Sequence, residues 1–394
     1  MTQIAPTDPQ IPVDFRRDQW DRRPFNCWSF QNIAAFLRTE QIAPAETITD
    51  LPLSATSLEG FVVTRGAVQT PLSDYLAQNY VDGFLVLLDG AIAYEGYWNG
   101  MRPQTPHLLQ SMSKSITSIA LGRLIEDGLV NPDARIATYL PELSVTAWQH
   151  ATLRQVLDMC TGLVYTEDYD VPDSDMGITD YATGWKPLPA GIAPGSWPGS
   201  IWDQILSLSR RVEPGEFHYA SIETEVLGCL IERVTGRTLA QVIAAYVWQP
   251  IGAELPASIT LDPKGTASAS GGISCTLRDL GRFGQAILQD GIVAGNQVLP
   301  RDFIQDIKCG GRVPLTADYH SLLPKGGYRS QFWIEDMAKE NLYCLGIFGQ
   351  MLYIAPKSKL VIAQLSSQPS PLDPKLAADQ MALVRQIAAR SLAF

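Results

Sequence analysis

The sequence is poor in the residues that build metal centres and disulfide frameworks. Its 394 residues include four histidines and six cysteines, with no C-x-x-C pair and no H-E-x-x-H motif. We therefore expect neither a metal nor another cofactor. The cysteines are expected to be reduced and mostly buried thiols, as is typical of a cytoplasmic protein.

Basic residues are also scarce, and long apolar runs are missing. The chain has 30 Lys and Arg against 41 Asp and Glu, a formal net charge of -11. Nucleic acids and anionic membranes repel an acidic surface, so neither is an expected partner. No run is long enough to span a bilayer, and residues 1–24 lack the apolar core of a signal peptide. The sequence favours a small-molecule partner and leaves a homodimer open.

Strand patterns occur in two separate parts of the chain. Two apolar runs between residues 81 and 98 surround Asp89-Gly90, a pair that is typical of a β-hairpin. Residues from Thr276 to Leu288 predict an amphipathic helix, and residues 373–392 predict a closing helix. Further strands are predicted over residues 331–334, 342–348, 351–355 and 360–366.

The order of these elements predicts an α+β fold. Residues 132–260 are helical and loop-rich, so we expect a mainly helical lobe inserted into an antiparallel sheet that is flanked by helices. The sheet lobe would comprise residues 26–131 and 261–394. Residues 1–25 are rich in Pro, Asp and Arg and are predicted to form a poorly ordered arm. A binding site is expected between the lobes.

Ser111 and Lys114 stand three residues apart in the predicted first turn of a helix that ends near Glu126. Residues at this spacing share one helix face, so the hydroxyl and the amine would lie side by side. The helix dipole and burial would both favour the neutral amine. Ser111 is therefore a candidate nucleophile, although a helix cap followed by a surface lysine would give the same spacing.

Three further segments follow S-x-x-K: residues 151–163 (ATLRQVLDMCTGL), 215–221 (GEFHYAS) and 271–280 (GGISCTLRDL). Because S-x-x-K and these three segments occur in this order and at these spacings, the sequence resembles the serine hydrolases of the β-lactamase and penicillin-binding-protein superfamily. The resemblance covers most of residues 26–394. Within it, the chain is most similar to the 6-aminohexanoate-dimer (nylon-oligomer) hydrolases and the family VIII carboxylesterases. The resemblance implies a β-lactamase/DD-peptidase-like fold and an enzyme that acts through an acyl-enzyme on small linear amides or esters.

The resemblance assigns Tyr219, in Tyr219-Ala220-Ser221, to proton transfer beside Ser111 and Lys114. Chemistry at a serine needs a group that takes its proton and later protonates the leaving group, and a lysine or a tyrosine can do so. Which of Lys114 and Tyr219 is the base stays open. Ser221 is implied as a substrate contact. A tyrosine that is buried only for packing is the alternative.

The strand expected over residues 342–348 would supply half of an oxyanion hole. The resemblance assigns the backbone N–H groups of Ser111 and Ile347 to the oxyanion, and Phe348 to the substrate pocket. Penicillin-binding proteins have K-T-G here, whereas residues 344–350 of this chain read CLGIFGQ. The missing lysine removes the usual holder of a β-lactam carboxylate, so we expect little turnover of penicillins. The nylon-oligomer hydrolases carry His at the position of Phe348.

The acidic segment over residues 168–197 is predicted as a long loop that binds the substrate. By resemblance, Tyr169 hydrogen-bonds the scissile amide, Asp180 faces a free ammonium and Trp185 lines the pocket. A carboxylate in a partly desolvated cleft is suited to hold a cation. A solvated acidic loop is the structural alternative. A carboxylesterase, a β-lactamase or D-amino-acid peptidase, and a non-catalytic binding protein of this fold stay open as other functions.

Overall fold

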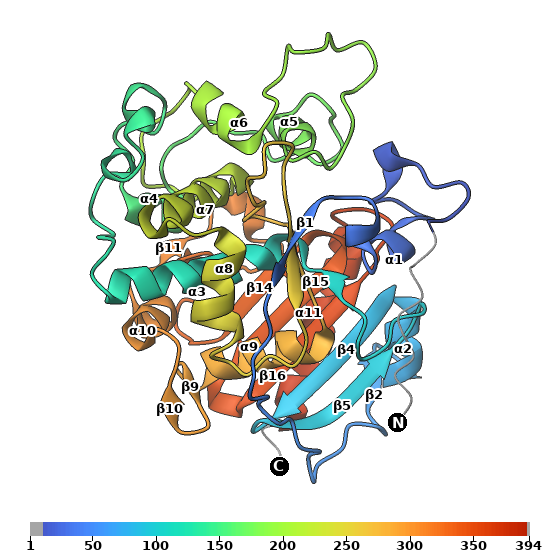
Figure 1. The fold of residues 1–394 in the computed structure, drawn as a ribbon. Coiled ribbons are helices and arrows are strands. Elements are labelled where there is room, and N and C mark those ends of the chain that lie inside the picture. The colour runs from blue at the N-terminus through green and yellow to red at the C-terminus, as the bar shows by residue number, and fades with distance from the viewer. Residues whose placement is uncertain (1–10, 392–394) are drawn as a thin grey trace.

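The computed structural model describes residues 11–391, and its main unit is an antiparallel sheet (Figure 1). Within these residues the strands are, in spatial order, β11 (Val313–Pro314), β12 (Gly327–Arg329), β13 (Phe332–Ile334), β14 (Leu342–Gly346), β15 (Gln350–Ala355), β16 (Leu360–Ser366), β4 (Val81–Leu88) and β5 (Ala91–Tyr97). Ile362 of β16 stands opposite Val86 of β4. This pairing confirms that the early and late strands of the chain share one sheet.

The β4–β5 hairpin turns at Asp89-Gly90, as predicted. Both residues have positive φ, 51° and 83°, which a two-residue turn of type I′ requires. Successive side chains of β4 point to opposite faces of the sheet, and both faces are buried. The continuous apolar run in this strand is therefore explained by cover on two sides.

Helices provide that cover. Helix α9 (Leu277–Leu288) packs against β4, β15 and β16 on one face, while α11 (Pro374–Ser391) and α2 (Leu72–Gln78) lie on the other. Accordingly, Leu85 joins Phe283 of α9 in one apolar cluster, and Val86 joins Val384 of α11 in another. Helix α9 begins as predicted, because the Thr276 hydroxyl accepts a hydrogen bond from the backbone N–H of Asp279, three residues later.

The segment from residue 132 to residue 260 is mainly helical, as expected. Helix α3 (Ser113–Glu126) precedes it and packs against α7 (Ser221–Thr235). In Figure 1 this segment lies on one side of the sheet, with α3 between the two. Its other described helices are α4 (Leu153–Leu157), α5 (Asp175–Ala182), α6 (Ile201–Ser207) and α8 (Leu239–Ile243).

A smaller sheet positions the start of α3. Its strands, in spatial order, are β1 (Thr39–Ile42), β7 (Ala257–Thr260), β8 (Ile273–Cys275) and β6 (His107–Leu108). The Leu109 N–H donates to the Ile273 carbonyl at 2.8 Å, which fastens the chain just before Ser111. The remaining short elements are β2 (Val62–Arg65), β3 (Val68–Pro71), β9 (Ile292–Val293), β10 (Asn296–Gln297), α1 (Asn26–Ser29) and α10 (Arg301–Cys309).

Two local predictions are wrong. Ser111 does not lie in the first turn of α3 but in a 3₁₀ turn, η3 (Gln110–Met112), directly before it. The acidic segment predicted as an irregular loop contains α5, which begins where the Ser174 hydroxyl accepts the Gly177 N–H at 2.9 Å. The cap and the apolar residues that α5 buries, Met176 and Ala182, were hard to recognise among the many Asp, Gly and Pro residues around them.

The prediction of a loose arm is also wrong for residues 11–25. Trp20 is 1% exposed, and its ring meets Trp185 edge-on with centroids 5.5 Å apart. Phe15 contacts Trp28 and Phe36 at 5.3 Å and 5.0 Å. Burying a large ring stabilises the fold by roughly 2 kcal/mol, which outweighs the polar composition of the segment. Residues 1–10 of the predicted arm lie outside the described residues.

Candidate active site

Ser111 and Lys114 lie side by side at the start of α3. Lys114 Nζ is 2.9 Å from Ser111 Oγ and donates a second hydrogen bond to the Ser270 carbonyl, also at 2.9 Å. Lys114 is 2% exposed, so its amine meets the hydroxyl away from bulk water. The hydroxyl and the amine are therefore adjacent, as their spacing predicts, although they span the junction between a 3₁₀ turn and a helix.

Burial controls the charge of Lys114. Removing the amine from water penalises its charged form and lowers its pKa to about 8. The carboxylates of Glu167 and Glu225 oppose this shift, since a nearby negative charge favours the ammonium. Near neutral pH, a minority of the lysine is thus a neutral amine that can accept a proton.

Tyr219 reaches the same pair from a position two residues before α7. Lys114 Nζ lies 5.1 Å from the centre of its ring, which stacks on Trp333 with centroids 5.4 Å apart. Burial raises the pKa of Tyr219 well above its usual value, and the charge of Glu167 adds to the rise, whereas a hydrogen bond with Ser111 opposes it. The phenol is therefore protonated at neutral pH. The structure brings Ser111, Lys114 and Tyr219 together.

Glu167 is a site residue that sequence reasoning did not single out. Its carboxylate accepts hydrogen bonds from the Tyr169 hydroxyl at 2.6 Å, from Ser221 Oγ at 2.5 Å and from the Ser221 N–H at 2.8 Å. It therefore holds together two residues that were predicted as substrate contacts. The neighbouring Asp168 turns outward and accepts from backbone N–H groups of its own loop. Nothing local in Glu167-Asp168 indicates which of the two acids points inward.

Glu225 is the second missed acid, and it is buried within α7. Its carboxylate accepts hydrogen bonds from the backbone N–H groups of Ala269 and Ser270, at 2.8 Å and 3.0 Å. This contact fixes the loop whose Ser270 carbonyl receives the Lys114 amine. A charged residue among the apolar residues of this segment was the available signal, because such a residue is rarely buried without a partner.

A cleft opens in front of Ser111 and encloses about 540 Å³, part of it open to solvent. Most of the predicted site residues line it, and so do Trp20 and Asp21 of the supposed arm. The predicted residues in its wall are Ser111, Lys114, Tyr169, Asp180, Trp185, Ser221, Ile347 and Phe348.

Asp180 lies in this cleft and forms an ion pair with Lys186. Its Oδ2 is 2.9 Å from Lys186 Nζ, and the same amine is 2.8 Å from Asp21 Oδ2. Burial raises the pKa of Asp180, and the positive charge of Lys186 opposes the rise. The carboxylate that the resemblance assigns to a substrate ammonium is thus already paired with a cation of the protein. Sequence reasoning missed both Lys186 and Asp21.

The end of β14 packs tightly on the turn that carries Ser111. A side chain at Gly346 would place its Cβ 2.8 Å from the Leu109 carbonyl oxygen, so only glycine fits. The chain then passes into η8 (Ile347–Gly349), where Phe348 has a left-handed backbone with φ 63°. Its ring is buried against Phe30, with centroids 5.2 Å apart. Packing on the N-terminal segment thus accounts for an aromatic residue at this position.

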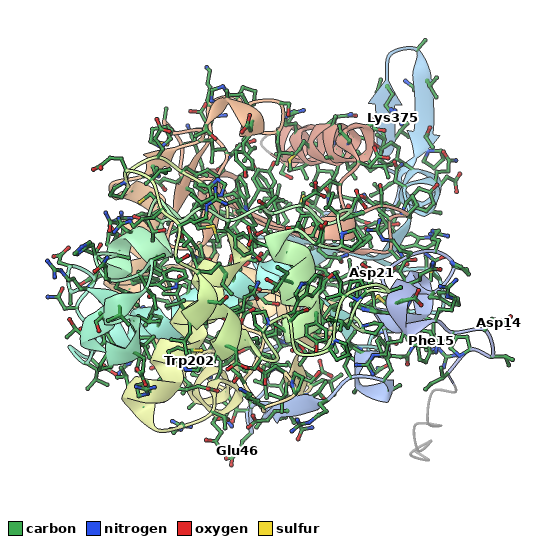
Figure 2. All side chains as sticks on the ribbon, turned by 90° about the horizontal axis from the view of Figure 1, so that it is seen from above. Asp14, Phe15, Asp21, Glu46, Trp202 and Lys375 are labelled. Atoms are coloured by element: carbon green, nitrogen blue, oxygen red, sulfur yellow. The ribbon has the colours of Figure 1, made fainter. Side chains whose placement is uncertain are left out.

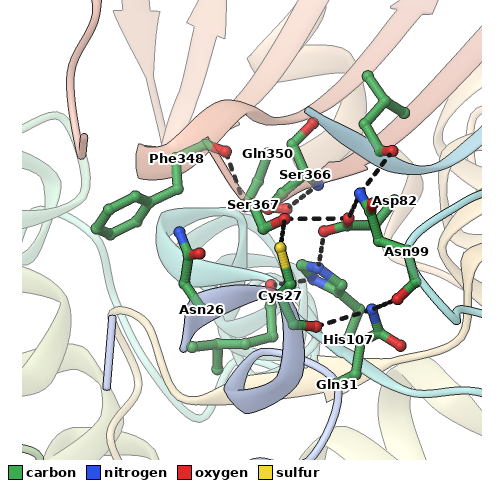
Figure 3. Close-up of polar contacts among 12 residues, drawn as sticks. Asn26, Cys27, Gln31, Asp82, Asn99, His107, Phe348, Gln350, Ser366 and Ser367 are labelled. Carbon is green, nitrogen blue, oxygen red and sulfur yellow. Dashed lines mark hydrogen bonds and ion pairs between the residues drawn. The ribbon is translucent and has the colours of Figure 1, made fainter. Parts of the chain in front are cut away.

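A buried polar cluster supports this turn from behind (Figure 3). Gln350 donates to the Phe348 carbonyl at 3.3 Å and to the Ser366 carbonyl at 2.6 Å. Beside it, Ser367 Oγ donates to Asp82 at 3.0 Å, and His107 Nε2 lies 3.1 Å from the other oxygen of that carboxylate. The cluster ties β4, β6, β15 and β16 to the strand end that borders the cleft.

Residues 11–391 contain neither a metal-binding cluster nor a membrane-spanning helix. No group of three or more His, Cys, Asp or Glu side chains there is arranged to hold a metal ion. None of the helices in this part of the chain is long and apolar enough to cross a membrane.

Known proteins are similar to this chain in sequence and in fold. Residues 76–386 match the family model described as Beta-lactamase. A 6-aminohexanoate-dimer hydrolase from Paenarthrobacter ureafaciens is 33% identical over 362 residues, which cover 90% of this chain and 88% of that protein. Esterase EstB from Burkholderia gladioli is 26% identical over 183 residues, which cover 42% of this chain and 41% of that protein.

Solved structures extend the comparison. A Bacillus anthracis protein described as a candidate 6-aminohexanoate-dimer hydrolase has a TM-score of 0.85 at 28% identity, covering 96% of this chain and 97% of that one. A family VIII carboxylesterase has a TM-score of 0.58 at 15% identity, covering 80% and 96%, and supports the fold alone. The predicted fold is confirmed. The chain belongs to the Beta-lactamase family and is a hydrolase of the β-lactamase fold, similar to a 6-aminohexanoate-dimer hydrolase and to esterases.

Proposed function

We propose that this protein is a serine hydrolase that cleaves small linear amides or esters through an acyl-enzyme. The proposal depends above all on the 2.9 Å contact between Ser111 Oγ and the buried Lys114 Nζ. A serine hydroxyl is a weak nucleophile until a base takes its proton. Lys114, whose pKa is lowered to about 8, is suited to be that base.

Acylation would begin with attack of Ser111 Oγ on the substrate carbonyl carbon, while the hydroxyl proton passes to Lys114 Nζ. The backbone N–H groups of Ser111 and Ile347 are assigned to the resulting oxyanion, since both residues line the cleft. Collapse of this intermediate breaks the bond to the amine or alcohol, which takes up a proton as it leaves. Water then attacks the Ser111 ester and loses its proton along the same path, and the acid product is released.

Lys114 and Tyr219 differ in protonation state near neutral pH, and they are therefore assigned different roles in proton transfer. Part of Lys114 is neutral near pH 7, whereas Tyr219 keeps its proton because burial raises its pKa. We assign removal of the Ser111 proton to Lys114 and protonation of the leaving group to Tyr219. Proton transfer of this kind contributes typically 10²- to 10⁴-fold to a rate.

Labelling tests the nucleophile directly. A fluorophosphonate probe should modify the purified protein once, and mass spectrometry of the digest should place the adduct on Ser111. Ser111→Ala should not be labelled. Ser115→Ala is a matched control, since Ser115 Oγ donates to the Gln331 carbonyl, whereas the Lys114 amine donates to Ser111 and to the Ser270 carbonyl. This variant should be labelled like the wild type. An adduct on another residue, or none, would contradict the proposal.

A carboxylesterase is the second candidate. It is favoured by the pairing of Asp180 with Lys186, because a neutral ester needs no free carboxylate in the cleft. Parallel assays with p-nitrophenyl butyrate and a linear ω-amino-acid amide separate the two. Turnover of the ester alone would favour the esterase, and turnover of the amide would favour the amidase.

A further inference from the structure

Gln110 is a buried residue whose side-chain amide has no partner in the described chain. It is 3% exposed, lines the cleft and comes directly before Ser111. Its amide forms no hydrogen bond with another group among residues 11–391. The polar atoms of these residues that lack a partner and are also sealed from solvent do not include this amide, so it stays accessible from the cleft. Buried polar groups are nearly always paired, and this amide therefore indicates a position for a ligand group.

Two other buried glutamines show how such a side chain is ordinarily satisfied. Gln331 Nε2 donates to the Leu157 carbonyl at 2.9 Å, and Gln350 Nε2 donates to the Ser366 carbonyl at 2.6 Å. A glutamine amide has two donor hydrogens and an acceptor oxygen, and burying them without partners is costly. Gln110 departs from this pattern in the wall of the cleft, where a substrate can supply the missing partner.

The backbone of Gln110 is held in an uncommon conformation. Its φ is 50°, in the left-handed region, which costs a residue with a side chain about 1 kcal/mol or more. The Leu109 N–H donates to the Ile273 carbonyl at 2.8 Å, and a Cβ at Gly346 would lie 3.1 Å from that of Gln110. Such a conformation persists only where the surrounding structure requires it. The base of the Gln110 side chain is therefore fixed relative to Ser111.

Charged groups in the cleft wall are already paired with one another. Lys186 Nζ lies 2.8 Å from Asp21 and 2.9 Å from Asp180. Asp21 belongs to the N-terminal segment and lies further in than Asp14 in Figure 2. Gln110, by contrast, is neutral and offers both N–H groups and a carbonyl. Its complement is an uncharged group that also donates and accepts, and a secondary amide is such a group.

We propose that Gln110 is a specificity-determining residue, whose side-chain amide hydrogen-bonds an uncharged amide in the acyl chain of the substrate. The inference rests on the proposed hydrolase function and names its substrate class: linear acyl groups that carry a second amide a few atoms from the scissile bond. The acyl chain is attached to Ser111 in the acyl-enzyme, and the Cα atoms of Gln110 and Ser111 are about 3.8 Å apart. A neutral hydrogen bond favours the matching ligand by about threefold to tenfold.

The test compares two p-nitrophenyl esters whose acyl chains have the same length, hexanoate and N-acetyl-β-alaninate. In the second, an amide replaces two methylene groups. The esters differ in intrinsic reactivity, so the quantity compared between proteins is the ratio of their kcat/KM values, amide ester over alkyl ester. Gln110→Met keeps the length of the side chain and removes its amide, and it should lower this ratio by about threefold to tenfold.

Gln285→Met is the matched control. The Gln285 amide also lacks a partner among residues 11–391, but it lies on α9 and does not line the cleft, so the ratio should stay at the wild-type value. A second variant covers the case in which Gln110→Met does not fold. Gln110→Gly also removes the amide, and because glycine adopts a positive φ without strain, this variant should fold and lower the ratio to the same extent.

The outcomes separate this inference from the proposed function. If the wild type hydrolyses neither ester, the hydrolase proposal fails and this inference fails with it. If both esters are hydrolysed and the ratio is unchanged in a folded Gln110 variant, the role of Gln110 is overturned. Equal losses on both esters would also overturn it, because they would indicate a general effect on the nucleophile instead of recognition of the acyl amide.

Discussion

Glu167 and Ser221 are joined by two hydrogen bonds, from Ser221 Oγ at 2.5 Å and from its backbone N–H at 2.8 Å. This contact fastens the acidic loop to the N-terminus of α7, where the helix dipole also favours a carboxylate. Because Tyr219 lies just before α7, the same negative charge acts on Tyr219 and on Lys114. We infer that Glu167 positions the loop and also sets the balance of protons in the site.

The pH dependence of kcat/KM should report the protonation state of Lys114. With neutral Lys114 as the base, kcat/KM for p-nitrophenyl butyrate should rise with pH and have its midpoint near 8. Glu167→Gln removes a charge that favours the ammonium, so the pKa of Lys114 and the midpoint should fall, by up to about one pH unit. Asp170→Asn, an exposed acid of the same loop, should leave the midpoint in place. An unchanged or higher midpoint in Glu167→Gln would argue against this role.

Ser111→Ala should lower hydrolysis of every substrate by about 10⁴-fold or more, because no other group can form the acyl-enzyme. The loss of one hydrogen bond with Lys114 costs only about 1 kcal/mol of stability, so the protein should stay folded. Activity of the purified variant and its thermal unfolding curve check both statements. Retained turnover in a folded variant would rule out Ser111 as the nucleophile.

Lys114→Ala and Tyr219→Phe should each lower kcat by about 10²- to 10⁴-fold, with little change in KM. Both act on proton transfer and therefore on the barrier. The double variant should be little worse than the poorer single one, since residues that act as a unit are not additive. Lys114→Met, which keeps the volume of the buried chain, controls for the cavity. Losses that multiply would show that the two residues act independently.

Gly346→Ala tests the contact between β14 and the turn that carries Ser111. The added Cβ would lie 2.8 Å from the Leu109 carbonyl oxygen and 3.1 Å from Gln110 Cβ, so the turn must shift. A displacement of the nucleophile relative to Ile347 should lower kcat by about tenfold or more. Gly60→Ala, where the new methyl group meets open space, should behave like the wild type. Unchanged kcat in Gly346→Ala would show that this spacing is not critical.

Lys186→Met should destabilise the protein, because it leaves two buried carboxylates, Asp21 and Asp180, without their shared cation. Removing one partner of such a group costs roughly 3 kcal/mol. Lys186 opposes the effect of burial on Asp180, so loss of the cation raises the pKa of Asp180 in the folded state. The destabilisation should therefore grow as pH rises from about 5 to about 8. Urea denaturation at both pH values measures this change, and Lys186→Arg should restore most of the stability. A cost that is independent of pH would point to lost packing instead.

The sequence by itself determined the order of the main elements and the central chemistry. The apolar run over Leu360–Ser366 predicts β16 with its observed bounds, because hydrophobic patterning and turn residues act over short distances. The same holds for the hairpin at Asp89-Gly90. The adjacency of Ser111 and Lys114 also follows from spacing, since residues three apart face the same side in a 3₁₀ turn as in an α-helix.

Only the tertiary structure decided which charges surround this chemistry. Glu225 reaches the Ser270 loop, and Lys186 reaches Asp21, across long stretches of chain. Contacts of this kind depend on how separate elements pack, which no local pattern encodes. Asp21 shows the difference most clearly: a polar segment was predicted to be loose, but burial of Trp20 against Trp185 carries the neighbouring carboxylate into the cleft. The large apolar area buried by the rings, rather than the average polarity of the segment, determines where that charge lies.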